Sequence, residues 1–261
     1  MFLMLRIVFI ENLEPETLYS LKTDIGTISV ATSSCAGLIN AEDYRIDQNS
    51  DDNQKAFQAA IDAVPEGGTL LIPPGRFQTS PIFLKPRMTL LLSEMSEIAA
   101  VKERTNWPIL PAYDSSNRVI GTWEGLPEAC FAAFITAIDC AELYITGSGI
   151  IDGGGDRSDW WSWPKDTRNG ARRPRTLQLS YSNDVEISGI TIRNSPSWTV
   201  HPYRCRKMVI SSIYIENPPD SPNTDGLNPE SCEDVTIVGV DFSVGDDCIA
   251  IKAGKRSARE F

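Results

Sequence analysis

The stretch that decides the fold is Val-Glu-Ile-Ser-Gly-Ile-Thr-Ile at residues 185–192. Related stretches follow at 209–215 and 235–242, and a shorter one, Leu-Tyr-Ile-Thr-Gly at 143–147, precedes it. The three full stretches each hold two short runs of β-branched apolar residues on either side of a Ser or Gly corner. Such runs are typical of half-buried strands joined by a tight bend. Repeated units of this kind predict a stacked architecture.

The central residues of these stretches are Ile145, Ile187, Ile210 and Ile237. The last two steps between them are of similar length, and the first is nearly twice as long. A unit of the shorter size has room for about three short strands and their turns, because a strand rises about 3.3 Å per residue. One unit cannot bury its apolar face alone, whereas stacked units can. We therefore predict an all-β fold, a right-handed parallel β-helix with an insertion in the longest step.

Leucine-rich repeats are the competing stacked architecture. They fit less well, because the units lack a helical stretch and favour Ile and Val over Leu.

One amphipathic helix is expected before the coils, over about residues 52–64. Its apolar face consists of Phe57, Ala60, Ile61 and Val64, and its candidate N-caps are Asn49, Ser50 and Asp51. A solenoid needs an amphipathic element over its end. We predict that this helix caps the first coil.

Residues 1–35 are predicted to form a separate domain before the β-helix, which is expected over 36–261. The apolar run at 1–10 contains Arg6 and lacks both a basic start and a small-residue cleavage site, so we interpret it as a strand and not as an export signal. The Leu-Glu-Pro-Glu-Thr-Leu-Tyr run at 13–19 resembles the tyrosine corner of a fibronectin type III module. The first domain is therefore expected to be a partial, fibronectin-III-like segment.

The composition excludes several classes of partner. The chain has 35 acidic and 24 basic residues and a net charge of −11, whereas nucleic acids and anionic membranes require a basic footprint. No run approaches the length of about 20 apolar residues that spans a membrane. The six cysteines show no C-x-x-C spacing, so we expect buried thiols and no zinc site. Basic residues do gather at 157–175, which predicts a local patch for an acidic partner.

Two acidic turns, Asn-Thr-Asp225 and Gly-Asp246-Asp247, lie about one coil apart. We therefore expect the carboxylates of Asp225 and Asp246 on neighbouring coils, roughly 4.8 Å from each other. The steps from Arg175 to His201 and from His201 to Asp225 are also close to one coil. These steps predict one column of side chains. Turn chemistry or a calcium site is the alternative interpretation of the aspartates.

Carboxylates this close to one another indicate chemistry, because they raise each other's pKa and a solenoid has no structural need for them. Glycoside hydrolysis uses such a pair: one carboxylic acid protonates the leaving oxygen, and a second carboxylate activates water or attacks carbon. Side chains alternate along a strand. Asp246 and Asp247 therefore serve one cleft only if the backbone bends near Gly245.

Three motifs carry a resemblance to a known family: Asn-Ser-Pro-Ser-Trp-Thr-Val-His-Pro at 194–202, Asn-Thr-Asp at 223–225, and Gly-Asp-Asp-Cys-Ile-Ala-Ile-Lys at 245–252. In this order they resemble the polygalacturonases of glycoside hydrolase family 28, and the first motif is closer to the bacterial exo-acting members. The resemblance runs from roughly Ala41 to the end of the chain. It includes the Gly-Gly-Thr-Leu-Leu-Ile-Pro-Pro-Gly and Gly-Ile-Ile-Asp-Gly segments.

The resemblance implies a pectin-lyase-like β-helix that hydrolyses α-1,4-linked galacturonic acid with inversion and uses no metal or organic cofactor. By similarity Asp246 is the general acid, and Asp225 and Asp247 hold and activate the attacking water. The implied partner is an acidic polysaccharide, polygalacturonate or pectin oligosaccharides, bound by a monomer. Family members are often secreted or periplasmic. Because the substrate is a polyanion, the expected substrate-binding residues are Asn223, His201, Lys252, Arg175 and Arg173.

The sequence also departs from the family pattern. The family's Gly-His-Gly loop and Arg-Ile-Lys strand come after the aspartate pair, yet His201 is the only histidine here. We therefore expect a fragment that lacks part of the active site and hydrolyses polygalacturonate poorly. Two other functions are considered: a non-catalytic fragment that binds oligogalacturonate, and a Ca²⁺-dependent pectate lyase with an Arg base.

The basic patch at 157–175 has an alternative interpretation as a solvated loop. Three tryptophans lie beside it and either stack on sugars or pack an insertion onto the solenoid: Trp160, Trp161 and Trp163.

Overall fold

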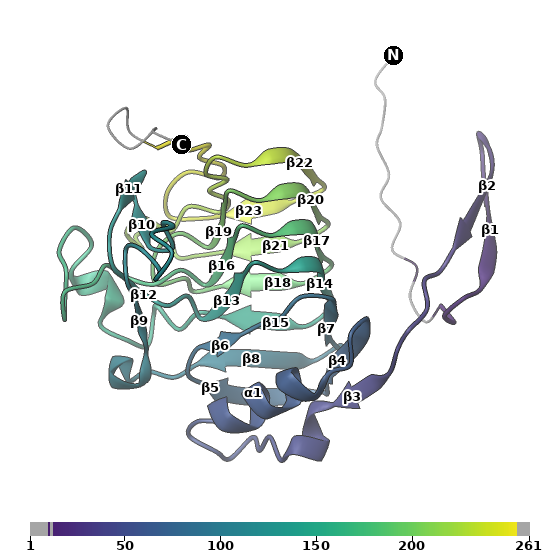
Figure 1. Cartoon of the computed structure of the whole chain (residues 1–261), viewed down its shortest axis with the longest axis horizontal. Coiled ribbons are helices and arrows are strands. Elements are labelled where there is room, and N and C mark those ends of the chain that lie inside the picture. The colour runs from purple at the N-terminus through teal and green to yellow at the C-terminus, as the bar shows by residue number, and fades with distance from the viewer. Residues whose placement is uncertain (1–9, 11–12, 255–261) are drawn as a thin grey trace.

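The computed structural model describes residues 10 and 13–254, most of which wind into a parallel β-helix (Figure 1). The first sheet contains β3 (Leu38–Asn40), β4 (Gly68–Ile72), β7 (Met88–Leu92), β14 (Ala141–Gly147), β17 (Asn183–Ser188), β20 (Arg206–Ser211) and β22 (Glu233–Val238). The second contains β5 (Gly75–Thr79), β8 (Ser96–Ala100), β15 (Ile150–Asp152), β18 (Thr191–Arg193), β21 (Tyr214–Glu216) and β23 (Asp241–Ser243). The third contains β6 (Ile82–Phe83), β13 (Ile135–Ile138), β16 (Leu177–Ser180) and β19 (Val200–Tyr203). The predicted fold is confirmed.

The hydrogen-bond register of the first sheet follows the sequence repeat. Ile145 pairs with Ile187, Ile187 with Ile210, and Ile210 with Ile237, so the steps of unequal length all return to the same position in the sheet. The extra residues of each longer step therefore lie in the connections between strands.

The corner between the first and second sheets is occupied by Gly189, Ser212 and Gly239 in three successive coils. Their φ angles are 76°, 52° and 61°, in the left-handed region. Glycine adopts this conformation without steric cost, which explains the Gly at two of the three corners. The Ser or Gly corner predicted from the repeat is confirmed.

The interior of the β-helix is a column of stacked apolar side chains. In the first sheet the inward positions of successive coils are at most 1% exposed: Leu70, Leu90, Ile145, Ile187 and Ile210. Burial of one such side chain contributes about 1.5–3 kcal/mol relative to its exposure to water. Each coil therefore supplies the apolar surface that its neighbour needs.

Helix α1 (Gln54–Ala63) covers the first coil, as predicted, and contacts β3 and β6 (Figure 1). Its buried face contains Phe57, Ala60 and Ile61. The predicted caps are wrong, because the helix begins later and its N-cap is Asn53. The Asn53 side chain does not cap the helix. It accepts the N–H of Asp47 at 2.8 Å and donates to the carbonyl of Gln78 at 2.9 Å.

The N-terminal segment is an antiparallel hairpin of β1 (Leu18–Thr23) and β2 (Gly26–Ala31) that stands apart from the coils (Figure 1). The Tyr19 hydroxyl accepts the backbone N–H of Glu14 at 2.7 Å, a contact of the kind found in tyrosine corners. The assignment of a fibronectin-III-like domain stays a prediction. The strand expected at 1–10 lies outside the described residues apart from Ile10. In the described part of the chain, no helix has the length and apolarity to cross a membrane.

Two insertions lie beside the third sheet. One, between β8 and β13, has no signal in the repeat pattern and contains a 3-10 turn (Arg104–Asn106), β9 (Ile109–Leu110), β10 (Thr122–Trp123), β11 (Leu126–Pro127) and β12 (Cys130–Phe131). The other, between β15 and β16, is the insertion predicted in the longest step and contains a 3-10 turn at Trp160–Ser162. Trp160 and Trp163 are buried, and the Trp160 ring lies 5.1 Å from Phe131 and 5.2 Å from Trp107. These two tryptophans therefore pack the insertions together.

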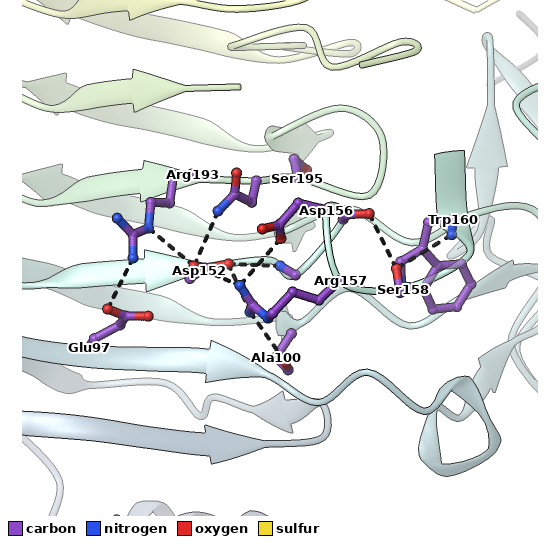
Figure 2. A network of polar contacts seen from close by, with 12 residues as sticks. Glu97, Ala100, Asp152, Asp156, Arg157, Ser158, Trp160, Arg193 and Ser195 are labelled. Atoms are coloured by element: carbon purple, nitrogen blue, oxygen red, sulfur yellow. Dashed lines mark hydrogen bonds and ion pairs between the residues drawn. The ribbon is translucent and has the colours of Figure 1, made fainter. Parts of the chain in front are cut away.

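Asp152, a buried residue at the end of β15, anchors the second insertion through a partly exposed polar network (Figure 2). Its carboxylate accepts hydrogen bonds from both terminal nitrogens of Arg157 at 3.0 and 3.1 Å and from Arg193 Nε at 3.1 Å. Arg193 also bonds Glu97 on β8 at 3.1 Å. Burial opposes ionisation of Asp152, but the hydrogen bonds and charges of the two arginines outweigh it and lower its pKa. The network joins three coils of the second sheet.

Candidate active site

The third sheet continues beyond β19 through single bridges that carry the aspartate segments. Val200 pairs with Leu227 and Leu227 with Ile249, so the first of these two steps is longer than the second. Tyr203, Glu230 and Lys252 form a second row of bridges with the same steps. The residues just before these bridges, including the predicted catalytic aspartates, therefore lie at one end of the third sheet on neighbouring coils.

The predicted side-chain column is wrong in its register. Since Leu227 pairs with Ile249, Asp225 lies opposite Asp247 and not Asp246, and the backbone N–H of Gly226 donates to the Asp247 carbonyl at 2.9 Å. His201 pairs with Gln178 and does not lie opposite Asp225. The residue opposite Asp225 is three positions earlier in the chain than His201. The register differs from the prediction because successive coils differ in length. A spacing close to the average coil length therefore does not determine which residues of neighbouring coils lie opposite each other.

The true column at this position contains Arg175, Trp198, Asp225 and Asp247. Leu177 pairs with Val200 and Val200 with Leu227, which places Arg175 opposite Trp198 and Trp198 opposite Asp225. The N–H of Thr199 donates to the Asp225 carbonyl at 2.8 Å, in agreement with this register. A tryptophan therefore takes the position that the spacing gave to His201.

Asp225 is almost buried, at 4% exposed, and has two polar partners. Its Oδ2 accepts a hydrogen bond from Asn228 Nδ2 at 2.7 Å and lies 3.7 Å from Lys252 Nζ. Burial raises the pKa of Asp225, and the negative charge of Asp246 raises it further, while Asn228 and Lys252 act in the opposite direction. Asp225 is therefore a carboxyl group whose proton affinity depends on its neighbours, as acid–base chemistry requires.

Asp246 and Asp247 are exposed, and the chain bends at residues 245–246. The bend predicted at Gly245 is therefore present. The N–H of Gly245 donates to Thr224 Oγ1 at 3.2 Å, and a Cβ at Gly245 would lie 2.5 Å from the carbonyl oxygen of Ser221, so only glycine fits. The bend frees the two aspartates from strict alternation.

The alternative of a calcium site finds no support in the geometry. Calcium takes six to eight oxygen ligands, several of them carboxylates. In the described part of the chain, no group of three or more His, Cys, Asp or Glu side chains is arranged to hold a metal ion.

Two tryptophans and two cations form a compact cluster beside Asp225. Trp198 stacks on Trp123, from β10, with ring centroids 5.5 Å apart and planes 7° apart. The Arg175 guanidinium lies 4.6 Å from the Trp123 centroid and 4.5 Å from that of Trp198. Lys252 Nζ lies 4.2 Å from the Trp198 centroid. We call these four residues the cation–tryptophan cluster; sequence reasoning missed the role of both tryptophans.

Arg173 and Arg175 have protein partners and are each 1% exposed. Arg173 donates to the carbonyls of Pro196 and Pro222 at 2.8 and 2.9 Å and to Asn223 Oδ1 at 2.6 Å. Burial, with a contribution from the Arg175 charge, lowers the pKa of Arg173 to about 9. The solvated-loop interpretation is wrong for these two arginines. Contact of either arginine or of Asn223 with a substrate stays a prediction.

Arg175 donates to the carbonyls of Arg173 and Thr122 at 2.7 and 2.8 Å. Burial lowers its pKa, while the negative charges of Glu230 and Asp225 act in the opposite direction. Arg175 therefore brings positive charge to the site from the coil that precedes that of Trp198.

His201 is buried, at 1% exposed, and its Nε2 lies 2.9 Å from Oε2 of Glu230. Burial lowers the pKa of His201 and so favours the neutral imidazole, while the hydrogen bond with Glu230 acts in the opposite direction. Burial also opposes ionisation of Glu230, but its hydrogen bonds with His201 and Thr122 outweigh that effect and lower its pKa. Sequence reasoning missed Glu230, because neither its residue type nor its distance from the other motifs distinguishes it from the turn residues around it.

The six cysteines are free thiols. Cys130, Cys140 and Cys205 are buried, and Cys205 lies next to Cys232 on the following coil, with its N–H 3.4 Å from the Cys232 sulfur. The expectation of buried thiols is confirmed for these three. The expectation is wrong for Cys35 and Cys248, which are exposed.

The sequence model of the family described as Glycosyl hydrolases family 28 matches residues 121–259, just over half of the chain. The chain belongs to this family. The match includes the three predicted catalytic aspartates, the cation–tryptophan cluster and Glu230. The resemblance stated from the three motifs is confirmed.

Relatives of this family 28 chain include a probable polygalacturonase of Vitis vinifera, 36% identical over 208 residues, which cover 77% of this chain and 41% of that protein. The crystal structure of a hyperthermoactive exopolygalacturonase from Thermotoga maritima superposes with a TM-score of 0.72 at 25% identity, covering 85% of this chain and 56% of that one. A family 28 exopolygalacturonase of Yersinia enterocolitica has the same fold, with a TM-score of 0.77, 23% identity, and coverage of 96% and 53%. The chain thus spans about two fifths of the Vitis protein and just over half of the two solved chains.

Proposed function

We propose that this chain carries the catalytic aspartates of a polygalacturonase, a glycoside hydrolase that cleaves α-1,4-galacturonosidic bonds of pectin with inversion. The observation that carries the proposal is the meeting of Asp225, Asp246 and Asp247 at one end of the third sheet, beside Lys252. Family membership and relatives described as polygalacturonases support the same activity.

For the three carboxyls we propose the roles that the family resemblance implies. Asp246 stands on the exposed bend and acts as general acid toward the leaving oxygen. Asp225, buried and bound by Asn228, and Asp247, opposite it in register, hold and activate the attacking water. An inverting mechanism needs space for that water between the acid and the base, with carboxyls about 6.5–9.5 Å apart.

The charge around the aspartates suits a polyanionic substrate. Lys252, with a side chain 22% exposed, is the cation of the cluster that reaches the surface, whereas Arg175 is buried. We propose that Lys252 binds a uronate carboxylate and that Arg175 and Arg173 contribute positive potential to the site. We propose that the chain acts as a monomer and without a cofactor.

The test is hydrolysis of polygalacturonate and trigalacturonate by the chain, with the anomer of the new reducing end read by NMR. We expect slow release of the β-anomer, loss of this activity in Asp246→Asn, and no change in Asp241→Asn, which alters an exposed aspartate on β23 of the same coil. Unsaturated products that absorb in the ultraviolet would instead identify a lyase. Binding of trigalacturonate by the folded chain without turnover would leave a non-catalytic binding function in place of the proposed one.

A further inference from the structure

Glu230 joins parts of the site that are far apart in the sequence. It is 2% exposed, and Oε2 accepts hydrogen bonds from His201 on β19 and from Thr122 Oγ1 on β10 at 2.9 and 3.0 Å. Thr122 precedes Trp123 on β10, and His201 follows Trp198 by three residues. One carboxylate oxygen thus connects both segments that supply the stacked tryptophans.

The charge states of this pair follow from its surroundings. His201 faces Arg175 and Lys252, whose charges oppose protonation, and the carboxylate of Glu230, which favours it; burial lowers the pKa and the imidazole remains neutral. A neutral imidazole donates a hydrogen bond from only one nitrogen. Since Glu230 is an ionised acceptor, that nitrogen is Nε2. Nδ1 is then an acceptor, and it has no hydrogen-bond partner among the described residues.

We propose that Glu230 is a positioning residue of the aspartate site, which fixes His201 as the neutral Nε2–H tautomer and holds the Trp198 ring on which Lys252 rests. The contacts are continuous. The His201 ring lies 5.1 Å from the Trp198 centroid, edge to face at 81°, and Lys252 Nζ lies 4.2 Å from the same centroid and 3.7 Å from Asp225. The inference rests on the proposed function, because the position of Lys252 matters only if Asp225 acts on a substrate.

Glu230 has a second effect, as an internal counter-ion. The guanidinium of Arg175 donates to the carbonyl oxygens of Arg173 and Thr122, and the negative charge of Glu230 favours its ionised form. Buried charges without compensation are costly. A Gln at position 230 keeps the shape and one acceptor oxygen but removes this charge, so Glu230→Gln separates charge from packing.

The first test needs no enzymatic activity, because His201 is the only histidine and gives one pair of imidazole ¹⁵N signals. In the wild-type chain we expect the Nε2–H tautomer at neutral pH. A ring protonated at Nδ1 instead would overturn the proposal. Glu233→Gln, a change in an exposed glutamate of the same coil, is expected to leave the spectrum unchanged.

The second test is the hydrolysis of trigalacturonate. We expect Glu230→Gln to lower kcat/KM about tenfold to a hundredfold, since small misplacements in a site have effects of this size. Thr122→Val removes one of the two hydrogen bonds to the carboxylate and is expected to give a smaller loss, and it replaces Glu230→Gln if that variant does not fold. Wild-type activity in a folded Glu230→Gln chain would overturn the proposal. If the wild type shows no turnover, the proposed function fails, and the imidazole spectrum alone decides whether Glu230 sets the state of His201.

Discussion

Replacement of Asp152 by Asn removes one negative charge from the network at the end of β15 (Figure 2). The carboxylate accepts five hydrogen bonds, from the Gly154 N–H, twice from Arg157, and once each from Arg193 and Asn194. Loss of one partner of a buried ion pair costs about 3–5 kcal/mol. The Arg157 and Arg193 side chains are 29% and 32% exposed, so water solvates them partly once the pair is broken. We therefore expect a loss near the lower limit, about 3 kcal/mol.

The assay is urea unfolding followed by tryptophan fluorescence, with Tm as a second measurement. A loss of about 3 kcal/mol corresponds to a fall in Tm of roughly 6–12 °C for a chain of this size. The lowered pKa of Asp152 adds a pH dependence. Its contribution to stability is complete above the ordinary aspartate pKa of about 3.9 and is lost as the pH falls through the folded-state pKa. The difference between wild type and Asp152→Asn should therefore shrink in acid.

Asp156→Asn is the matched control, because Asp156 is exposed and bonds the same arginine once, at 3.3 Å. We expect it to change the free energy of unfolding by at most about 0.5 kcal/mol. Equal effects of the two substitutions at neutral pH would refute the reasoning, since the network would then contribute no more than a surface ion pair.

Three further outcomes are expected. Ile210→Ala should cost about 2–5 kcal/mol of stability in urea unfolding, because the side chain is 1% exposed between two stacked coils, whereas Val209→Ala at the half-exposed neighbouring position should cost far less. Lys252→Met should move the limb of the pH–rate profile that reports Asp225 to higher pH, because the positive charge of Lys252 lowers the pKa of that carboxyl; an unchanged limb would contradict the assignment. Brief alkylation of the folded chain, followed by mass spectrometry, should modify only the exposed thiols of Cys35 and Cys248. A buried thiol such as Cys140, whose pKa burial raises to about 11, should react only after unfolding.

The sequence repeat was sufficient to predict the coils, because a strand pair must return to the same hydrogen-bond register whatever the length of its turns. Ile187, Ile210 and Ile237 are therefore opposite one another although the two steps between them differ in length. The end helix was predictable for a similar reason, since its apolar face has a helical period.

The site was less predictable, because it depends on the turns. An average period placed His201 opposite Asp225, although the longer step from Val200 to Leu227 puts Trp198 there. Trp123 and Thr122 reach the site from an insertion that shows no repeat, and Glu230 follows a turn rich in polar residues. Contacts between such segments arise from the tertiary path of the chain, which no local pattern encodes.

The constant register has a consequence for how such proteins diversify. The step from Ile145 to Ile187 contains a whole insertion, yet these two residues pair in the same way as Ile187 and Ile210, whose step contains none. Length changes in a connection leave the neighbouring ladder intact, so their energetic cost is confined to loop closure, which grows only slowly with length. Residues 165–170, most of which are exposed, are thus the part of the second insertion where length can change at little cost. Variation of this turn between homologues would reshape the surface beside the third sheet without redesign of the scaffold.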